Sequence, residues 1–529
     1  MTSNPSAGVT HDVVFQLGSD SYGFMLKQGT QVEERVNDFA PSIGLGDNPA
    51  FAEGAWRAWE QSGFTEGVDQ RLFSSKQKCW WTDGNIDTTR DQITQLGAAW
   101  ASSDASKVAT APMIVDFLQA ATDVVLAAIG TKIRRFNTST EVWADSTTTL
   151  GASATFLYMH GANAFAACGA GADFYRSADG DTWAQPAAGQ KASCFATWAE
   201  KLYLGYTNTI KSSTDNGATW SAAVNIGDPS TNILNMISAF NDLLFIRKED
   251  GLYYYDGTNV VEVYHNNNNL YAGNKTLFYH VNDGYMYMGE LGSIKKFSIS
   301  SGTITNMVDV TPSMLGDAAK ELYGHGTPIW IWSGPQYLYC AFDDGEGLYP
   351  EILKYNGLGW HQVYRGTSGD TLNAAGYSRL MGWNFLNDGA TRRQKMVTLK
   401  EIPRADYPAS GQLMTGYFDA GLPQMPKGFG SVRVWARNVS AANYITVDYR
   451  TRDDEAWTTL GTITSDVWPN PTTILFSTAN KSIGANAIQL RFTITTASAT
   501  ATPVLERFSV KYLNRPLTVH AYSMVLNIK

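Results

Sequence analysis

Two short polar motifs contain the residue types that most readily suggest chemistry in this 529-residue chain. Each combines a hydroxyl, a carboxylate, a glycine and an indole, and the members are Ser177, Asp179, Gly180 and Trp183, then Ser213, Asp215, Gly217 and Trp220. The second motif has the spacing S-x-D-x-G-x-T-W, and the first is one residue shorter. In such an Asp-box the carboxylate accepts backbone N–H bonds, glycine supplies a positive φ, and the Trp ring packs beneath the turn. The motifs therefore predict structural turns between strands, and no catalytic role.

The densest carboxylate cluster is formed by Asp343, Asp344 and Glu346. Hard oxygen ligands suit Ca²⁺, so this loop is a candidate ligand or calcium site, and a solvated turn is the alternative. The four cysteines are far apart and include no C-x-x-C pair, so a structural zinc site is not predicted. Four buried free thiols are expected, with a Cys168–Cys194 disulfide as the alternative. We predict neither a cofactor nor a metal.

A repeat of about forty residues positions these motifs in the chain. Six segments share an aromatic strand, a polar turn and a second strand, and they end at residues 143, 183, 220, 260, 304 and 360. The successive differences are 40, 37, 40, 44 and 56 residues. This period is typical of a β-propeller, for which we predict six or seven blades within residues 61–404. Closure is expected to use an N-terminal strand at residues 71–74.

The residues after the propeller have a different pattern. Apolar and polar side chains alternate in four segments, which are Val432–Ala436, Tyr444–Tyr449, Ile488–Ile494 and Phe508–Tyr512. Such alternation predicts strands with one buried face, and residues 405–529 are assigned to a jelly-roll-like β-sandwich. Residues 1–60 have few periodic signals and are predicted to be an irregular docking arm. The predicted fold class is therefore all-β.

Composition narrows the function classes. The net charge is −9, and no run of Lys or Arg could contact phosphates, so nucleic-acid binding is not expected. The polar N-terminus is not a secretion signal, and the most apolar stretch, at residues 112–130, includes Asp116 and Asp123. Two carboxylates make a membrane span too costly, so we expect synthesis in a cytoplasm without a signal peptide.

No catalytic constellation is visible in the sequence. The seven histidines include no H-E-x-x-H motif, and neither a P-loop nor a nucleophile elbow is present. A sialidase needs three arginines around a carboxylate, a Tyr/Glu nucleophile pair and an acidic residue. Arg176, Arg247, Arg365 and Arg379 are available, but the early F-R-I-P element of that family is absent. A non-enzymatic protein is predicted, with a propeller glycosidase as an alternative.

Both ends of the two-domain region resemble structural proteins of tailed bacteriophages. The resemblance lies in the G-x-x-x-G-x-x-Q-R strand of residues 63–71, in Ile488–Phe492, and in Thr502–Tyr512. It implies a virion protein of the tail, baseplate or collar, of the minor tail, tail-fibre or receptor-binding type. Its partners would be other virion proteins and copies of itself in threefold or sixfold symmetry. Binding of a host surface glycan is the alternative.

Apolar anchors near both termini add to the assembly prediction. Val13–Phe15 and Phe24–Leu26 interrupt a polar arm, and residues 519–526 are too hydrophobic for a free tail. We therefore expect both termini to insert into neighbouring chains.

Overall fold

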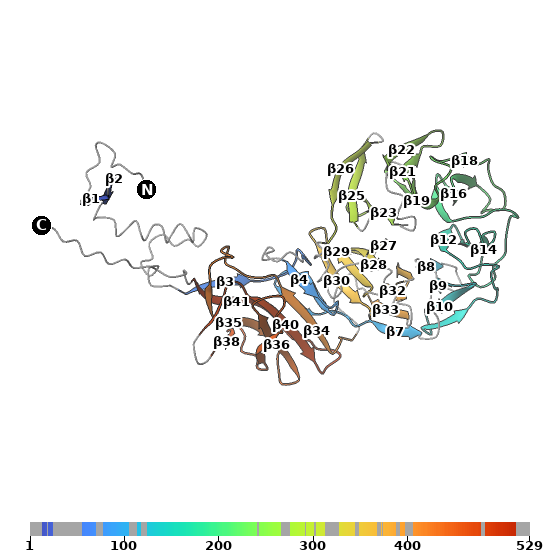
Figure 1. Ribbon diagram of the computed structural model, residues 1–529. Coiled ribbons are helices and arrows are strands. Elements are labelled where there is room, and N and C mark those ends of the chain that lie inside the picture. The colour runs from blue at the N-terminus through green and yellow to red at the C-terminus, as the bar shows by residue number, and fades with distance from the viewer. Residues whose placement is uncertain are drawn as a thin grey trace.

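A computed structural model describes residues 13–17, 20–24, 56–69, 78–104, 114–117, 124–240, 243–265, 276–290, 293–300, 303–312, 327–343, 349–367, 372, 374–387, 392–396, 406–477 and 482–514. Within these residues the regular elements are all β-strands, which confirms the all-β prediction. Nor does this part of the chain contain a helix with the length and hydropathy needed to cross a membrane. Figure 1 shows a ring of small sheets beside a β-sandwich.

Seven antiparallel sheets of the described chain follow one another and form a propeller-like array (Figure 1). Their strands, sheet by sheet, are β8 (Ile114–Phe117), β9 (Val124–Ile129), β10 (Lys132–Asn137) and β11 (Val142–Asp145); β12 (Phe156–His160), β13 (Asn163–Ala167) and β14 (Tyr175–Ser177); β15 (Cys194–Trp198), β16 (Lys201–Tyr206), β17 (Thr209–Ser213) and β18 (Val224–Asn225); β19 (Ile233–Ala239), β20 (Leu243–Lys248), β21 (Gly251–Tyr255) and β22 (Val260–His265); β23 (Leu277–His280), β24 (Tyr285–Glu290), β25 (Ser293–Ser300) and β26 (Thr303–Asp309); β27 (Thr327–Ser333), β28 (Leu338–Asp343), β29 (Glu351–Tyr355) and β30 (Trp360–Arg365); β31 (Ala374–Ser378), β32 (Trp383–Asn387) and β33 (Arg392–Met396) with β7 (Ala101–Asp104). The first strand of each sheet contacts the first strand of the next, and β31 contacts β8.

The predicted hairpins form the outer parts of these sheets. The turns expected before residues 143, 260, 304 and 360 join β10 to β11, β21 to β22, β25 to β26, and β29 to β30. The inner strands are apolar on both faces, as Leu244, Phe245 and Ile246 of β20 illustrate by being fully buried. Sheets packed against neighbours on both sides require this continuous burial.

The strand that completes the seventh sheet comes from before the array. β7 pairs antiparallel with β33, so the chain enters the array as an outermost strand. The predicted closing strand at residues 71–74 lies outside the described residues.

The sandwich consists of two antiparallel sheets. Its strands are β3 (Arg57–Gln61), β4 (Cys79–Thr82), β5 (Ile86–Arg90), β6 (Ile93–Leu96), β34 (Ser410–Thr415), β35 (Lys427–Arg437), β36 (Asn443–Arg450), β37 (Thr458–Ile463), β38 (Thr472–Leu475), β39 (Ile483–Ala485), β40 (Gln489–Thr496) and β41 (Val504–Asn514). One sheet has the order β38-β35-β41-β6-β5, with β3 also on β41 and β39 on β35, and the other has the order β37-β36-β40-β34-β4. Buried rings such as Phe492 and Phe508 meet between the sheets, 4.8 Å apart at their centroids.

The predicted domain boundary near residue 61 is wrong in the structure. β4, β5 and β6 pair with strands of the sandwich, so the propeller array is inserted into the sandwich between β6 and β34. β3 also belongs to the sandwich, because it pairs with β41 from Arg57 opposite Tyr512 to Gln61 opposite Phe508. β3 belongs to the sandwich because its inward-facing side chain, Trp59, packs into the sandwich core. The Trp59 ring stacks on Phe418 at 4.4 Å and meets Phe508 edge-on.

The segment assigned to an irregular arm contains further regular structure. β1 (Val13–Leu17) and β2 (Asp20–Phe24) pair antiparallel as a hairpin. The anchor Val13–Phe15 is therefore part of a strand. Residues 1–12 and 25–55, including Met25 and Leu26 of the second anchor, lie outside the described residues, as do residues 519–526.

The inserted array also touches the sandwich directly. Val68 N donates to the carbonyl of Trp360 at 2.7 Å, and Trp100 Nε1 donates to the carbonyl of Val363 at 2.8 Å. Asp87 on β5 and Lys354 on β29 form a buried ion pair at 3.4 Å. These contacts hold the sandwich against the outer strands of the sixth sheet, and we call them the sandwich–array contact.

Candidate functional site

The two hydroxyl–carboxylate motifs form turns in which the carboxylate organises the backbone. Asp179 Oδ1 accepts hydrogen bonds from the backbone N of Asp181 and of Thr182, at 2.8 and 2.7 Å. Asp215 accepts from Thr219 N at 2.9 Å and from Ser213 Oγ at 2.7 Å. These bonds follow the predicted pattern, and they leave the carboxylates occupied within their own turns.

Glycine and tryptophan also take the predicted places in these turns. Gly180 and Gly217 have φ of 70° and 82°, in the left-handed region that favours glycine. Trp183 is buried, and Trp220 packs edge-on against Phe174 at 5.6 Å. The second turn joins β17 to β18, which are the outer strands of the third sheet.

The protonation of both aspartates follows from these bonds. Burial opposes ionisation of Asp179, but its hydrogen bonds outweigh burial and lower the pKa to about 2. For Asp215 the bonds from Thr219 and Ser213 lower the pKa to about 2. Both groups stay ionised at neutral pH, as acceptors for the turn.

Most of the predicted calcium loop lies outside the described residues. Asp343 is the last residue of β28, whereas Asp344 and Glu346 lie outside the described residues. Elsewhere in the described chain, no three His, Cys, Asp or Glu side chains gather as a metal site would require. The four cysteines are buried and free, as predicted, and burial raises the pKa of Cys79 to about 12 and of Cys168 to about 11.

The innermost strands of the array surround a cavity of about 440 Å³, which we call the central channel. Its lining includes the aromatic side chains of Tyr158, Phe278, Trp330, Trp332 and Tyr377. Trp330 and Trp332 are buried by packing among the inner strands. No Asp or Glu is among the described residues that line the channel.

Two titratable groups at the channel, Tyr158 and His160, are neutral at physiological pH, and the charged side chain among its described lining residues is that of Arg379. Tyr158 Oη accepts from Thr197 N at 2.7 Å, and His160 Nδ1 lies 2.8 Å from Thr197 Oγ1. Burial raises the pKa of Tyr158 and lowers the pKa of His160. The channel therefore presents rings and hydroxyls rather than a charged acid–base pair.

The four arginines considered for a sialidase site are spread over four sheets. Arg176 is on β14, Arg247 on β20 and Arg365 on β30, and Arg379 directly follows β31. Of these, only Arg379 lines the central channel. Arg365 instead stacks on Tyr349 at 4.0 Å and on Trp81 at 5.1 Å, within the sandwich–array contact. The structure thus brings no arginine triad together from these residues.

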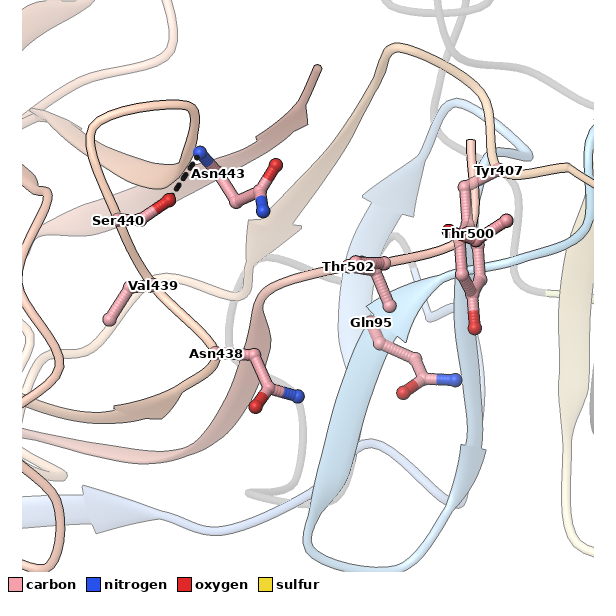
Figure 2. Close-up of a pocket in the computed structure, with 9 residues that line it drawn as sticks. Gln95, Tyr407, Asn438, Val439, Ser440, Asn443, Thr500 and Thr502 are labelled. Carbon is pink, nitrogen blue, oxygen red and sulfur yellow. Dashed lines mark hydrogen bonds between the residues drawn. The ribbon is translucent and has the colours of Figure 1, made fainter. Parts of the chain in front are cut away.

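Two further pockets lie on the sandwich. Figure 2 shows the first, a pocket of about 540 Å³ surrounded by amide and hydroxyl groups of Gln95, Asn438, Ser440, Asn443 and Thr502. Ser440 Oγ accepts from Asn443 N at 3.2 Å, as the dashed line in Figure 2 marks. One aromatic ring, that of Tyr407, also lines this pocket, and none of its described lining residues has a charged side chain.

The second pocket, of about 610 Å³, combines aromatic and charged side chains. It lies on the sheet that contains β35 and β41, and we name it the tryptophan groove after its principal residues, Glu60, Trp435, Arg437, Trp468, Glu506 and Arg507. The sequence did not predict it, because these residues come from four distant segments. The only signal was the outward half of the alternation in β35, where Arg433, Trp435 and Arg437 face away from buried Val432, Val434 and Ala436.

Comparisons with known proteins do not assign the chain to a family. No family model matches it, and no curated protein matches it. Among solved structures, a virginiamycin B lyase from Staphylococcus aureus is 9% identical over 57% of this chain and 97% of its own, with a TM-score of 0.42. The WD40 repeats of RRP9 are 7% identical over 57% of this chain and 98% of their own, with a TM-score of 0.43.

One matched structure extends over a longer part of the chain. The extracellular domain of a one-component system from B. thetaiotaomicron is 11% identical over 69% of this chain and 48% of its own, with a TM-score of 0.44. Scores and identities this low assign neither a function nor a ligand to the chain.

Proposed function

We propose that this chain is a non-enzymatic structural protein of a tailed-phage virion, in the tail, baseplate or collar, that docks to other virion proteins. The observation that carries the proposal is the pairing of β3 with β41, the last strand of the sandwich. Arg57 at the start of β3 lies opposite Tyr512 near the end of β41, so the segments before and after the sandwich leave it side by side. Both predicted docking segments can then reach the same neighbour.

The rest of the architecture supports a docked body with a projecting part. The propeller array is inserted between β6 and β34, and it lies to one side of the sandwich in Figure 1. The sandwich–array contact fixes it there through buried groups such as Asp87 and Lys354. A rigid spacer or docking disc needs such a fixed orientation. In this proposal the copies form a closed symmetric oligomer, as most soluble homo-oligomers do, and the resemblance to phage tail proteins implies threefold or sixfold symmetry.

The number of propeller blades and the topology of the sandwich are part of the same proposal. The contact of β31 with β8, and the pairing of β7 with β33, favour a seven-bladed propeller over a six-bladed one. If β6, β34, β35, β36, β37, β38, β40 and β41 are counted from one to eight, the sheets have the orders one-eight-three-six and two-seven-four-five. That is the order of a jelly roll, with the propeller inserted between its first and second strands.

Localisation in purified particles tests the proposal. Particles are imaged by cryo-EM and probed for the chain, and the proposal expects several symmetric copies in the tail or at the collar. A second chain that lacks residues 1–50 should fold, with an unchanged circular dichroism spectrum, but should fail to enter particles. The full-length chain with the same tag is the control. Absence of the chain from particles, or normal incorporation of the truncated chain, contradicts the proposal.

Binding of a host surface glycan by the tail is the second candidate function. Rigid aromatic side chains at a surface favour it, because they supply contact area at low entropic cost. Exposed Trp468 on the sandwich is such a side chain. Adsorption of phage to host cells in the presence of purified full-length chain tests this candidate. Undiminished adsorption at saturating protein would contradict it.

A further inference from the structure

The tryptophan groove contains an indole ring that is both exposed and held in place. The side chain of Trp468 is 52% exposed. Its Nε1 donates to Glu506 Oε2 at 3.0 Å, and its backbone N donates to Asp466 Oδ1 at 3.0 Å. Asp466 also accepts from the backbone N of Asn438 at 2.8 Å, which ties the turn to the end of β35. The ring is thus fixed by both its backbone and its indole N–H, while a large part of its surface faces solvent.

A second indole forms the floor of the groove. Trp435 lies opposite Arg507 in the β35–β41 register, and the Arg507 guanidinium stacks over the Trp435 ring at 4.2 Å. Arg507 Nη1 also donates to Glu60 Oε1 at 2.9 Å, so the guanidinium is held between a ring and a carboxylate. The groove therefore has a preorganised hydrogen-bonding wall beside an aromatic surface, and little side-chain entropy is lost when a ligand binds.

The charges of the groove select the ligand class. Three carboxylates, Glu60, Asp91 and Glu506, line it together with two guanidinium groups, Arg437 and Arg507. Arg437 pairs with Glu506, and Arg507 pairs with Glu60, so each guanidinium charge is balanced within the groove and neither an anion nor a cation finds an array of one sign. A neutral ligand with many hydroxyl groups can donate to the carboxylates and accept from the guanidinium groups. Its apolar C–H faces can also pack on an indole ring.

We propose that the tryptophan groove binds a neutral pyranose oligosaccharide, with the exposed face of Trp468 stacking on one sugar ring. The volume of about 610 Å³ lies within the range of small-molecule sites. Glu506 and Arg437 hold the hydroxyls of that ring, and Arg507 and Glu60 hold those of the next. The inference gives the glycan-binding alternative a defined site. It does not depend on whether the chain is part of a virion.

Isothermal titration calorimetry of the purified full-length chain tests the inference. The probes are cellohexaose, maltohexaose, mannohexaose and chitohexaose as neutral oligomers. The chitosan hexamer and the galacturonic acid hexamer are the cationic and anionic counterparts. At least one neutral oligomer should bind, and its charged counterparts should bind more weakly. The failure of all four neutral probes, or tighter binding of a charged oligomer, overturns the inference.

Variants locate the binding. Trp468→Ala should weaken binding by on the order of tenfold or more, because an aromatic side chain that the ligand covers dominates a small interface. Trp468→Phe should retain part of the affinity. The matched control is Trp56→Ala, since Trp56 is an exposed indole (41%) outside the groove that contacts Lys511 of the same β41 strand. Unchanged binding by Trp468→Ala, or an equal loss in the control, overturns the inference.

The outcome is separable from that of the proposed virion role. Absence from particles leaves sugar binding by the purified chain unaffected, and failure to bind sugar leaves the position in the particle unaffected. If the groove is protected from solvent only in assembled particles, and no sugar binds, the groove is a protein interface and the inference is wrong.

Discussion

Replacement of Gly67 by alanine tests whether the N-terminal segment is held tightly against the propeller array. Gly67 has a φ of +71°, and a Cβ atom at this position would lie 2.1 Å from the carbonyl oxygen of Trp360. That atom belongs to the backbone of β30 and cannot rotate away. Since real Cβ contacts are not closer than 3.0 Å, the two backbones must separate by about 0.9 Å, the difference between 3.0 and 2.1.

The expected cost follows from the bonds that this separation breaks. Val68 N donates to Trp360 O at 2.7 Å, and Asn356 Nδ2 donates to Thr65 O at 2.8 Å across the same contact. Two hydrogen bonds contribute a net of about 1–3 kcal/mol to the free energy of unfolding. Left-handed strain adds about 1–2 kcal/mol for any alanine at such a φ. Gly189→Ala is the matched control, because Gly189 also has a φ of +71° but nothing lies within 4 Å of its added Cβ.

Urea unfolding followed by tryptophan fluorescence measures both variants against the parent chain, and calorimetry shows whether one or two transitions occur. Gly189→Ala should show the strain alone, and Gly67→Ala should lose about 2 kcal/mol more, the midpoint of the hydrogen-bond range. Calorimetry of Gly67→Ala should also separate the sandwich and array transitions further. Equal losses in the two variants would mean that the segment around Gly67 is not clamped against β30, and the reasoning would be refuted.

Three other predictions follow from the described contacts. Asp215→Ala should lower the melting temperature. In the parent chain, the stability that Asp215 and Asp179 contribute should be present above their usual pKa of 3.8 and be lost as the pH falls towards 2. Thermal melts between these pH values check both predictions, and a melting temperature that does not depend on pH would contradict the assignment. Asp87→Asn and Lys354→Met should each lower the free energy of unfolding by about 3 kcal/mol, because each leaves a buried charged partner uncompensated. The double variant should lose less than the sum of the two single losses. Additive losses in this double-mutant cycle would show that the two side chains are not coupled. All four thiols should resist Ellman's reagent in the native chain and all four should react in denaturant without reductant, since they are buried and free; a denatured count of two would indicate a disulfide.

The outer hairpins of the array could be predicted from the sequence because their signals are local. An aromatic strand, a turn of Gly, Asn or Asp, and a second strand lie within about a dozen residues, as in Leu252 to Val260. The turn at Asp256 illustrates the chemistry, since its carboxylate accepts from the backbone N of Thr258 and of Asn259, at 2.8 and 2.7 Å. No distant residue is needed to form such a unit.

The membership of β3 to β6 could not be predicted in the same way. Alternation shows that a strand has a buried face, but it does not identify the strand with which it pairs. Trp59 pairs with Val510 across the whole inserted array, and Thr94 pairs with Leu505. Because the sequence places these segments directly before the first sheet of the array, proximity along the chain assigned them to the wrong domain.

The tryptophan groove shows the same limit for a site. Trp435, Trp468 and Arg507 belong to no motif, whereas the two hydroxyl–carboxylate turns could be predicted because all their members fall within eight residues. The groove forms because the β35–β41 register places Trp435 opposite Arg507, and because Asp466 ties the turn of Trp468 to Asn438. The strand register and the hydrogen bonds that fix the loop depend on the tertiary structure, so they cannot be predicted from the composition of each segment.

The insertion of the array has a mechanical consequence that a tandem arrangement would not have. Two covalent segments, from β6 to β7 and from β33 to β34, connect the bodies, and both reach the array at its seventh sheet, where β7 pairs with β33. The sandwich–array contact adds a second attachment at the sixth sheet, through Asp87 with Lys354 and through Trp100 with Val363. Attachment at two neighbouring sheets resists both bending and twisting, whereas a single linker resists neither. A force applied to the array is therefore transmitted into β5 and β6, through β41 to β3, and so to the end of the sandwich where Arg57 pairs with Tyr512.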